Sequence, residues 1–339
     1  MTATIFITGA TGLIGFRILL AALTAGHNVC YVARSEEKAQ IVSSNPAVQK
    51  LAPGDRLFSI IVPDLSVDGA FDEALKGVTH VIHAGAPTPV PTHDPMTEIY
   101  DPTIKIATNL LSSALKSPSL QRFVITSSIV ANLGLTSSSS AVNAYTRPPL
   151  PNPVPSAFSN VFEGYVTAKI VELYNTDEFI KTHNPPFTIS HVFPGYVFGR
   201  NELALDPVAM QTQNSSNNLL MMAMLGTEPP YHLLGGFVHV DDLADIHLRV
   251  LFLEPQVGEV QDFGILTKVD YETIFDYVQE AYPRAVANGI FKRGKVTNLP
   301  IAYDPSNIEE LLGRKPKSFR SAVLDVAGQY LDQLGIEKA

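Results

Sequence analysis

The stretch TGATGLIG, residues 8–15, limits most strongly what this chain can fold into. Its three glycines stand three residues apart, after a short β-rich run and before an apolar pattern that predicts a helix over 13–25. In that setting Gly9 permits a tight turn, Gly12 lets the backbone approach a pyrophosphate, and Gly15 allows close helix–strand packing. A pyrophosphate also binds well at the N-terminus of a helix. The stretch therefore predicts a dinucleotide-binding turn between a strand and a helix.

Strand patterns alternate with helical ones through the first two hundred residues. The strands are expected at residues 4–8, 28–33, 57–62, 78–83, 122–127 and 189–193, and one intervening helix at 99–116. This alternation predicts an α/β fold with a doubly wound parallel sheet covered on both faces. Beyond Gly199 we expect a strand at 258–266 and helices at 240–253, 271–281, 306–312 and 318–334, the first of them capped by Asp241 and Asp242.

This pattern suggests two domains. Residues 1–195 and 236–266 are expected to form the dinucleotide-binding domain, and residues 196–235 and 267–339 a smaller C-terminal substrate domain. Near Met221, Met222 and Met224, the apolar side chains suit either an adaptable lid or the core of the smaller domain.

Composition excludes several classes of function. A net charge of −9 argues against nucleic acid as a partner. No apolar run approaches the ~20 residues that cross a bilayer, and no basic segment precedes the first apolar residues, so we expect no membrane contact and a cytoplasmic location. The single cysteine, Cys30, excludes an internal disulfide framework. The histidines lack metal spacing, so no metal is expected and His83 and His239 are taken as structural. Monomer and homodimer both stay open.

The second predicted strand ends at Arg34, where an NAD site would carry a carboxylate for the ribose hydroxyls. An arginine can instead grip a 2′-phosphate with its forked donors. Lys38, one helical turn on, adds a second positive charge, although Glu36 and Glu37 dilute it. The strand end therefore favours NADPH over NADH. Asp64, just past the third strand, suits either a hydrogen bond from the adenine amino group or an ordinary turn.

A candidate catalytic group lies in YVTAK, residues 165–169, which begins a helical pattern. The i, i+4 spacing puts the Tyr165 phenol and the Lys169 ammonium on one helix face. An ammonium nearby eases ionisation of a phenol, which can then exchange a proton with a substrate oxygen. Ser128 belongs to a serine pair at the end of the fifth strand, where parallel sheets bind ligands. Its hydroxyl can orient a substrate carbonyl.

Together these motifs resemble the extended short-chain dehydrogenase/reductase superfamily. Within it they resemble the dihydroflavonol reductase-like branch and, most closely, the yeast-type NADPH-dependent methylglyoxal and ketone reductases. The resemblance covers nearly the whole chain, through TGATGLIG, VARSEEKA, VPDL, HAGAP, TSS, YVTAK, FPGYVFG and FVHVDDLADIHL in order. It implies a Rossmann fold and a catalytic triad of Ser128, Tyr165 and Lys169. The cofactor contacts it implies are Gly9, Thr11, Gly12, Leu13, Ile14, Gly15, Arg34, Lys38, Asp64, Leu65, Ala84, Gly85, Ala86, Thr126, Tyr165, Lys169, Pro194, Gly195, Tyr196 and Val197.

The reaction that the resemblance implies is carbonyl reduction by NADPH. Ser128 would hold the oxygen, Tyr165 would protonate it, and Lys169 would bind the nicotinamide ribose. No arginine or acidic cluster marks a charged substrate, so a small apolar or aromatic ketone or aldehyde is expected as the partner. Two alternatives stay open: a sugar-nucleotide epimerase or dehydratase, and a non-catalytic NADP-sensing regulator.

The chain departs from the resemblance at one position. Lys105-Ile106 replaces the asparagine–glycine pair that the family usually carries early in the helix after the fourth strand, and Asn109 is a later asparagine. Such an asparagine would help to support a water-linked proton path behind the lysine. That path therefore stays an open question for this chain.

Overall fold

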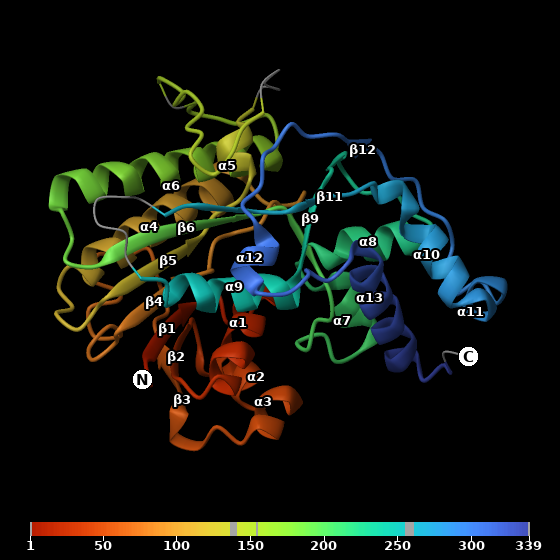
Figure 1. Cartoon of the computed structure of the whole chain (residues 1–339), viewed down its shortest axis with the longest axis horizontal. Coiled ribbons are helices and arrows are strands. Elements are labelled where there is room, and N and C mark those ends of the chain that lie inside the picture. Colours follow the sequence, from red (N-terminus) through yellow and green to blue (C-terminus); the bar gives the residue numbers. More distant parts are fainter. Residues whose placement is uncertain (1, 136–140, 154, 255–260, 338–339) are drawn as a thin grey trace.

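The computed structural model describes residues 2–135, 141–153, 155–254 and 261–337. Its centre is a seven-stranded parallel sheet in the order β10-β6-β5-β4-β1-β2-β3 (Figure 1). These strands are β1 (Thr4–Thr8), β2 (Asn28–Ala33), β3 (Leu57–Ile61), β4 (His80–His83), β5 (Arg122–Thr126), β6 (Thr188–Pro194) and β10 (Phe263–Ile265). The doubly wound α/β fold is confirmed, and the strand order reverses between β1 and β4, where such sheets bind ligands.

Side chains of one strand explain why both faces of the sheet are covered. Along β2, Val29 and Tyr31 join the apolar cluster on one face, whereas Cys30 and Val32 join the cluster on the other. Successive side chains of a strand point to opposite faces, so an almost continuous apolar run requires helices on both. Cys30 is fully buried, and burial raises the pKa of its thiol to about 12, as expected of a core thiol.

Helices α1 (Leu13–Thr24) and α9 (Val240–Leu251) cover one face of the sheet, and α4 (Asp101–Ala114) and α6 (Val161–His183) cover the other (Figure 1). The other helices of the described residues are α2 (Glu36–Ser43), α3 (Pro46–Leu51), α5 (Val130–Leu133), α7 (Pro207–Thr212), α8 (Asn217–Met224), α10 (Ile274–Ala281), α11 (Pro283–Ala287), α12 (Ile308–Leu312) and α13 (Phe319–Leu334). Short helical turns lie at Gly54–Arg56 and Tyr271–Thr273, and a π-helical turn, η2, lies at Pro95–Tyr100.

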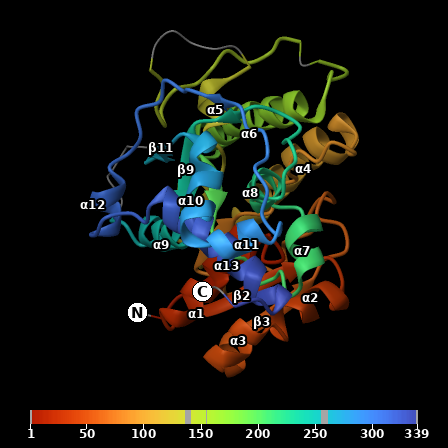
Figure 2. The same ribbon diagram turned by 90° about the vertical axis from the view of Figure 1, so that its right-hand side faces the viewer.

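A second apolar cluster lies beyond the main sheet. Helices α8, α10 and α13 pack around Phe198, Phe237 and Phe319, and α7, α8, α10, α11 and α13 gather on one side of the molecule (Figure 2). Two small sheets accompany them: β11 (Thr267–Lys268), β9 (Gly236–His239) and β7 (Tyr196–Phe198), and the pair β12 (Asn298–Leu299) and β8 (Leu233–Leu234). Met221 and Met224 are buried in this cluster and belong to the core, whereas Met222 is outside the cluster and lines the large cleft over the sheet.

Several predicted boundaries were wrong, for local reasons. Helix α6 begins at Val161 rather than at Tyr165, because the Asn160 side chain accepts from the backbone N–H of Glu163 at 2.9 Å and caps it there. Helix α9 is capped by His239 instead of Asp241 and Asp242, which occupy its first turn. The 99–116 helix is shorter because its first residues form the π-helical turn. Of the strand expected at 258–266, residues 263–265 are confirmed, and 258–260 lie outside the described residues.

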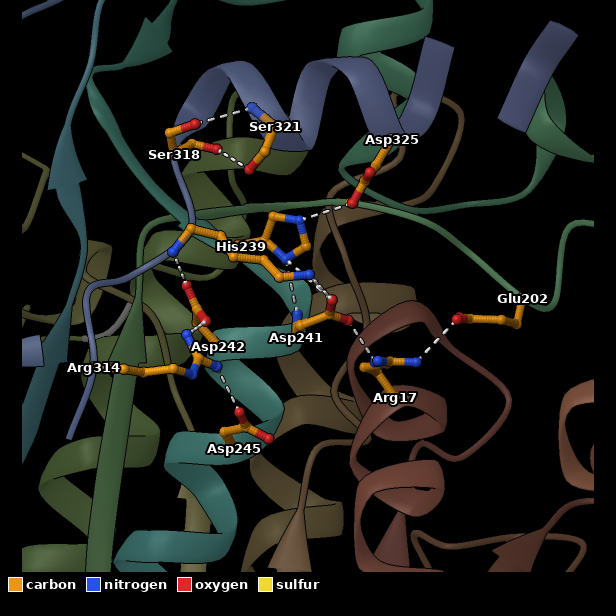
Figure 3. Close-up of polar contacts among 12 residues, drawn as sticks. Arg17, Glu202, His239, Asp241, Asp242, Asp245, Arg314, Ser318, Ser321 and Asp325 are labelled. Atoms are coloured by element: carbon orange, nitrogen blue, oxygen red, sulfur yellow. Dashed lines mark hydrogen bonds and ion pairs between the residues drawn. The ribbon is translucent and has the colours of Figure 1, made fainter. Parts of the chain in front are cut away.

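A network of charged side chains ties α9 to the C-terminal segment (Figure 3). Arg314 donates to Asp242 at 2.6 Å and to Asp245 at 2.7 Å, and the backbone N–H of Lys317 donates to the second oxygen of Asp242 at 2.6 Å. The Asp242 side chain is fully buried. A buried carboxylate that loses a charged donor destabilises the folded state, because nothing then compensates its lost solvation.

Replacing Arg314 by alanine is therefore expected to lower the free energy of unfolding by about 2 kcal/mol. Urea unfolding followed by circular dichroism measures this change. Lys76→Ala is the matched control, because it breaks the exposed pair Lys76–Glu73 and should leave the midpoint unchanged. Equal midpoints for wild type and Arg314→Ala would contradict the role assigned to Arg314.

Candidate active site

The glycine turn after β1 is shaped by backbone contacts. Gly9 has φ +77°, and a Cβ there would lie 2.4 Å from the carbonyl oxygen of Ala84. A Cβ on Gly15 would lie 2.3 Å from the carbonyl oxygen of Gly9. Gly12 is the N-cap of α1 and makes no side-chain capping hydrogen bond. The first N–H groups of α1 are therefore available to an anionic group.

A cleft of about 1510 Å³ opens over the carboxyl ends of the parallel strands. The predicted site residues that line it are Gly9, Thr11, Gly12, Leu13, Ile14, Gly15, Arg34, Lys38, Asp64, Leu65, Ala84, Gly85, Ala86, Ser128, Tyr165, Pro194, Gly195, Tyr196 and Val197. The structure thus brings together residues that are far apart in sequence; their roles stay predictions.

Two predicted residues do not line the cleft. The Thr126 hydroxyl points to the face of the sheet that α9 covers, where it lies 2.8 Å from Nε2 of His247. Lys169 is 2% exposed, and its ammonium donates to Glu172 at 2.7 Å and to the Thr126 carbonyl at 3.5 Å. For Lys169, then, the partner is a carboxylate three residues further along α6 that was not considered from the sequence, and tertiary packing buries the pair.

The cationic end of the cleft follows β2. Arg34 and Lys38 are both exposed and both line the cleft, and among the described residues no ion pair engages either of them. Ser35 caps α2 by accepting from the backbone N–H of Lys38 at 3.2 Å, which holds the two cations one turn apart. Asp64 accepts from the hydroxyl and the backbone N–H of Ser66, and these bonds lower the pKa of its carboxyl.

The other group of polar side chains comes from β5 and α6. Ser128 follows β5, and its hydroxyl accepts from the backbone N–H of Val130 at 3.4 Å. Tyr165 lies in the second turn of α6. Gly164 allows α6 to pack closely against η2, because a Cβ there would lie 2.8 Å from the carbonyl oxygen of Pro95. Ser128 and Tyr165 thus line one cleft from two elements.

An aromatic wall, which the sequence analysis did not identify, completes the cleft. Phe162 and Tyr231 stack with their ring centroids 5.5 Å apart, and both line the cleft beside Tyr196. Burial raises the pKa of Tyr231 to about 12, and Tyr165 adds to the shift. Phe162 stands three residues before Tyr165, so helical spacing offered a signal for it; Tyr231 lies in a loop that has no such signal.

Histidines and lysines outside the cleft's centre have structural positions. His239 caps α9, and its Nε2 lies 3.1 Å from Asp325 on α13 (Figure 3). His83 lies 2.7 Å from the Thr8 hydroxyl. Lys105 is exposed and lies 3.9 Å from Asp101, at the rim of the cleft. In the described ranges no group of three or more His, Cys, Asp or Glu side chains could hold a metal ion.

The sequence model of the NAD dependent epimerase/dehydratase family matches residues 5–196, more than half of the chain. The chain belongs to this family. The epimerase/dehydratase match spans the glycine turn, the serine pair and the Tyr165–Lys169 segment.

Individual relatives extend the similarity to more than nine-tenths of the chain. The ketoreductase CTB6 of Cercospora beticola is 32% identical over 97% of this chain and 95% of its own. The NAD-dependent epimerase/dehydratase ALT6 of Alternaria alternata is 32% identical over 92% and 93%. Yeast methylglyoxal/isovaleraldehyde reductase Gre2, solved with NADPH, shares the fold with a TM-score of 0.81 at 22% identity, over 98% of this chain and 99% of that one.

Through the described residues, each helix is too short or too polar to span a membrane.

Proposed function

We propose that this chain is an NADPH-dependent reductase of ketones and aldehydes. The observation that carries the proposal is a single cleft lined both by Arg34 and Lys38 after β2 and by Ser128 and Tyr165. The ketoreductase name of a relative at 32% identity supports the reaction, and the NADPH complex of yeast Gre2 supports the cofactor. An exposed, unpaired arginine beside a glycine turn suits a phosphorylated dinucleotide.

The residues of the cleft fit the cofactor. The turn at Gly9 and Gly15 would clash with any side chain there, and it leaves the N-terminus of α1 free for a pyrophosphate. Arg34 and Lys38 would hold the 2′-phosphate, Asp64 the adenine, and the segment Pro194 to Val197 the nicotinamide. When bound, NADPH supplies the hydride for carbonyl reduction.

The chain's own residues supply position and a proton. The Ser128 hydroxyl would donate a hydrogen bond to the substrate oxygen and orient it. The Tyr165 phenol would donate its proton to that oxygen. The Lys169 ammonium would stabilise the phenolate left behind and bind the ribose, which requires it to reach the cleft that it does not line in this structure. In the described residues, the cleft lining drawn from 194–234 holds no charged side chain, which favours an uncharged carbonyl compound. The stacked rings of Phe162 and Tyr231 favour a small apolar or aromatic one.

Two further features belong to the proposal. The division into a dinucleotide domain (1–195 and 236–266) and a substrate domain (196–235 and 267–339) is supported by the apolar cluster around Phe198 and Phe319, drawn mainly from the two segments of the smaller domain. A cytoplasmic location is supported by the single, buried cysteine.

A panel of carbonyl compounds assayed with NADPH and NADH side by side tests the proposal. We expect NADPH to be consumed when a ketone or aldehyde is added, with NADH much less effective. Tight NADPH binding without turnover on the whole panel would favour a regulator that senses NADP. Turnover of a nucleotide sugar without net cofactor consumption would favour an epimerase or dehydratase.

The aromatic wall predicts substrate preference. Replacing Tyr231 by leucine removes the ring that stacks on Phe162, and we expect KM for aromatic ketones to rise up to about tenfold. KM for small aliphatic aldehydes should change little, because they are too small to cover the wall. Tyr145→Leu, at a 60% exposed tyrosine outside the cleft, is the control. An equal rise for both substrate classes would argue against this role of the wall.

A further inference from the structure

A buried ion pair lies on α6 one turn beyond Tyr165. The Lys169 ammonium donates to Oε2 of Glu172 at 2.7 Å, and the two side chains are 2% and 1% exposed. The i, i+3 spacing places both on one side of the helix. Oε1 of Glu172 is also buried, and it has no hydrogen-bond partner among the described residues.

We infer that Glu172 is a positioning residue that holds the ammonium of Lys169 in place, protonated, for its work beside Tyr165. This inference rests on the proposed function, in which Lys169 binds the ribose and stabilises the phenolate. A lysine with so little exposure keeps its charge only where a carboxylate compensates the lost solvation. The Thr126 carbonyl, at 3.5 Å, is a neutral acceptor and gives far less compensation.

The second oxygen of Glu172 faces an imidazole N–H. The Thr8 hydroxyl accepts from the backbone N–H groups of Ala84 and Gly85, each at 3.1 Å, so its own hydrogen points to Nδ1 of His83, 2.7 Å away. Burial, with a contribution from Lys169, lowers the pKa of His83 to about 3, so the ring is neutral. Its one proton is therefore on Nε2, 3.9 Å from Oε1 of Glu172.

Thr8 and His83 lie between the ion pair and the backbone that lines the cofactor cleft. Ala84 and Gly85 line the cleft and press against Gly9 of the glycine turn. Thr8 and His83 thus lie between the backbone of that segment and Glu172, and Nε2 of His83 makes no hydrogen bond across the 3.9 Å to Oε1 of Glu172. Glu172 in turn holds Lys169. The Glu172 carboxylate would thereby fix the position of the Lys169 ammonium relative to Ala84 and Gly85 in the wall of the cofactor site.

Other titratable groups on the elements around Lys169 and Glu172 are engaged elsewhere or lie on the outer side. Glu178 and His183 line a groove between α4 and α6 into which Glu172 also opens, and the α4 side of that groove carries no ionisable side chain. Around α6, Glu98 accepts from the Asp94 backbone, Tyr100 packs on Phe158, Asp101 lies near Lys105, and His191 bonds Asp262. Within the described residues, Glu172 is the carboxylate paired with Lys169.

The decisive variant is Glu172→Gln, which keeps the shape of the side chain and removes its charge. Without that charge Lys169 would lose its proton at lower pH, so the alkaline limb of the kcat/KM profile for carbonyl reduction should move down by roughly one pH unit or more. Glu172→Asp keeps the charge and should retain most of the wild-type profile. Asp177→Asn is the matched control, because Asp177 lies on the same helix but pairs with Arg147; it should change only stability. An alkaline limb of Glu172→Gln that superimposes on that of wild type would overturn the inference.

Two measurements keep the test separate from the proposed function and from folding. NADPH affinity measured by fluorescence at pH 7 and pH 9 needs no turnover: it should fall at the higher pH much more in Glu172→Gln than in wild type, and equal falls would count against Glu172. If Glu172→Gln does not fold, Lys169→Met is added to it, which removes both charges. The double variant should regain a thermal midpoint near that of wild type, because only an unpaired buried charge is costly. A double variant no more stable than the single one would refute the coupling.

Discussion

Replacing Tyr165 by phenylalanine is expected to lower kcat for carbonyl reduction by about 10²–10⁴-fold. The phenylalanine ring fills the same space on α6 but has no proton to donate to the substrate oxygen. NADPH affinity should stay within a few-fold of wild type, because the glycine turn and Arg34 are untouched. Stopped-flow or steady-state NADPH oxidation gives kcat, and fluorescence titration gives the affinity.

A neighbouring phenol supplies the control for that experiment. Tyr231 lines the same cleft, and burial raises its pKa to about 12, so it holds its proton more firmly than a tyrosine in water does. Tyr231→Phe should keep kcat close to the wild-type value. If Tyr165→Phe retained full turnover, or if Tyr231→Phe lost as much, the assignment of Tyr165 as the proton donor would be wrong.

Replacing Arg34 by glutamate is expected to lower kcat/KM for NADPH by about 100-fold, since a charged hydrogen bond is lost and a carboxylate now repels the 2′-phosphate. NADH has no such phosphate, so its kcat/KM should stay the same or rise. The preference between the two cofactors is measured with one carbonyl substrate at fixed ionic strength. Because Arg34 is exposed, the variant should fold normally.

A second charge reversal controls for long-range electrostatics. Lys50→Glu makes the same change in net charge on α3, outside the cleft, and it should leave the cofactor preference unaltered. Equal losses of NADPH and NADH activity in Arg34→Glu would show that Arg34 shapes the loop rather than recognising the phosphate.

The fold could be predicted well from local patterns. The alternation of strands and helices, with the apolar run of β2, indicated a parallel sheet buried on both faces, and the strand at 28–33 is confirmed to the residue. Family membership, expected from the order of the motifs, is also confirmed. Boundaries were less predictable where a single side chain competes for the end of a helix, as Asn160 does at α6 and His239 at α9.

The buried side chains around Lys169, those of Glu172 and His83, were not predicted. Glu172 stands three residues after Lys169 and reads in the sequence as one more helical carboxylate, while His83 is distant along the chain. Whether such side chains are buried together depends on how α6 packs against β4 and β5. The same holds for the wall of Phe162 and Tyr231, which joins a helix to a remote loop.

By itself, the amino-acid sequence determined the elements of this protein and the kind of chemistry it carries, because glycine spacing, apolar periodicity and the end of a strand are local properties that neighbouring residues dictate. Only the tertiary structure decided which side chains share a cleft, and that the helical neighbours Lys169 and Glu172 are buried together. Those outcomes depend on the packing of elements far apart in sequence. Burial then sets how much each interaction contributes to stability. A charge in the core is desolvated and needs a partner, whereas an ion pair at the surface contributes little.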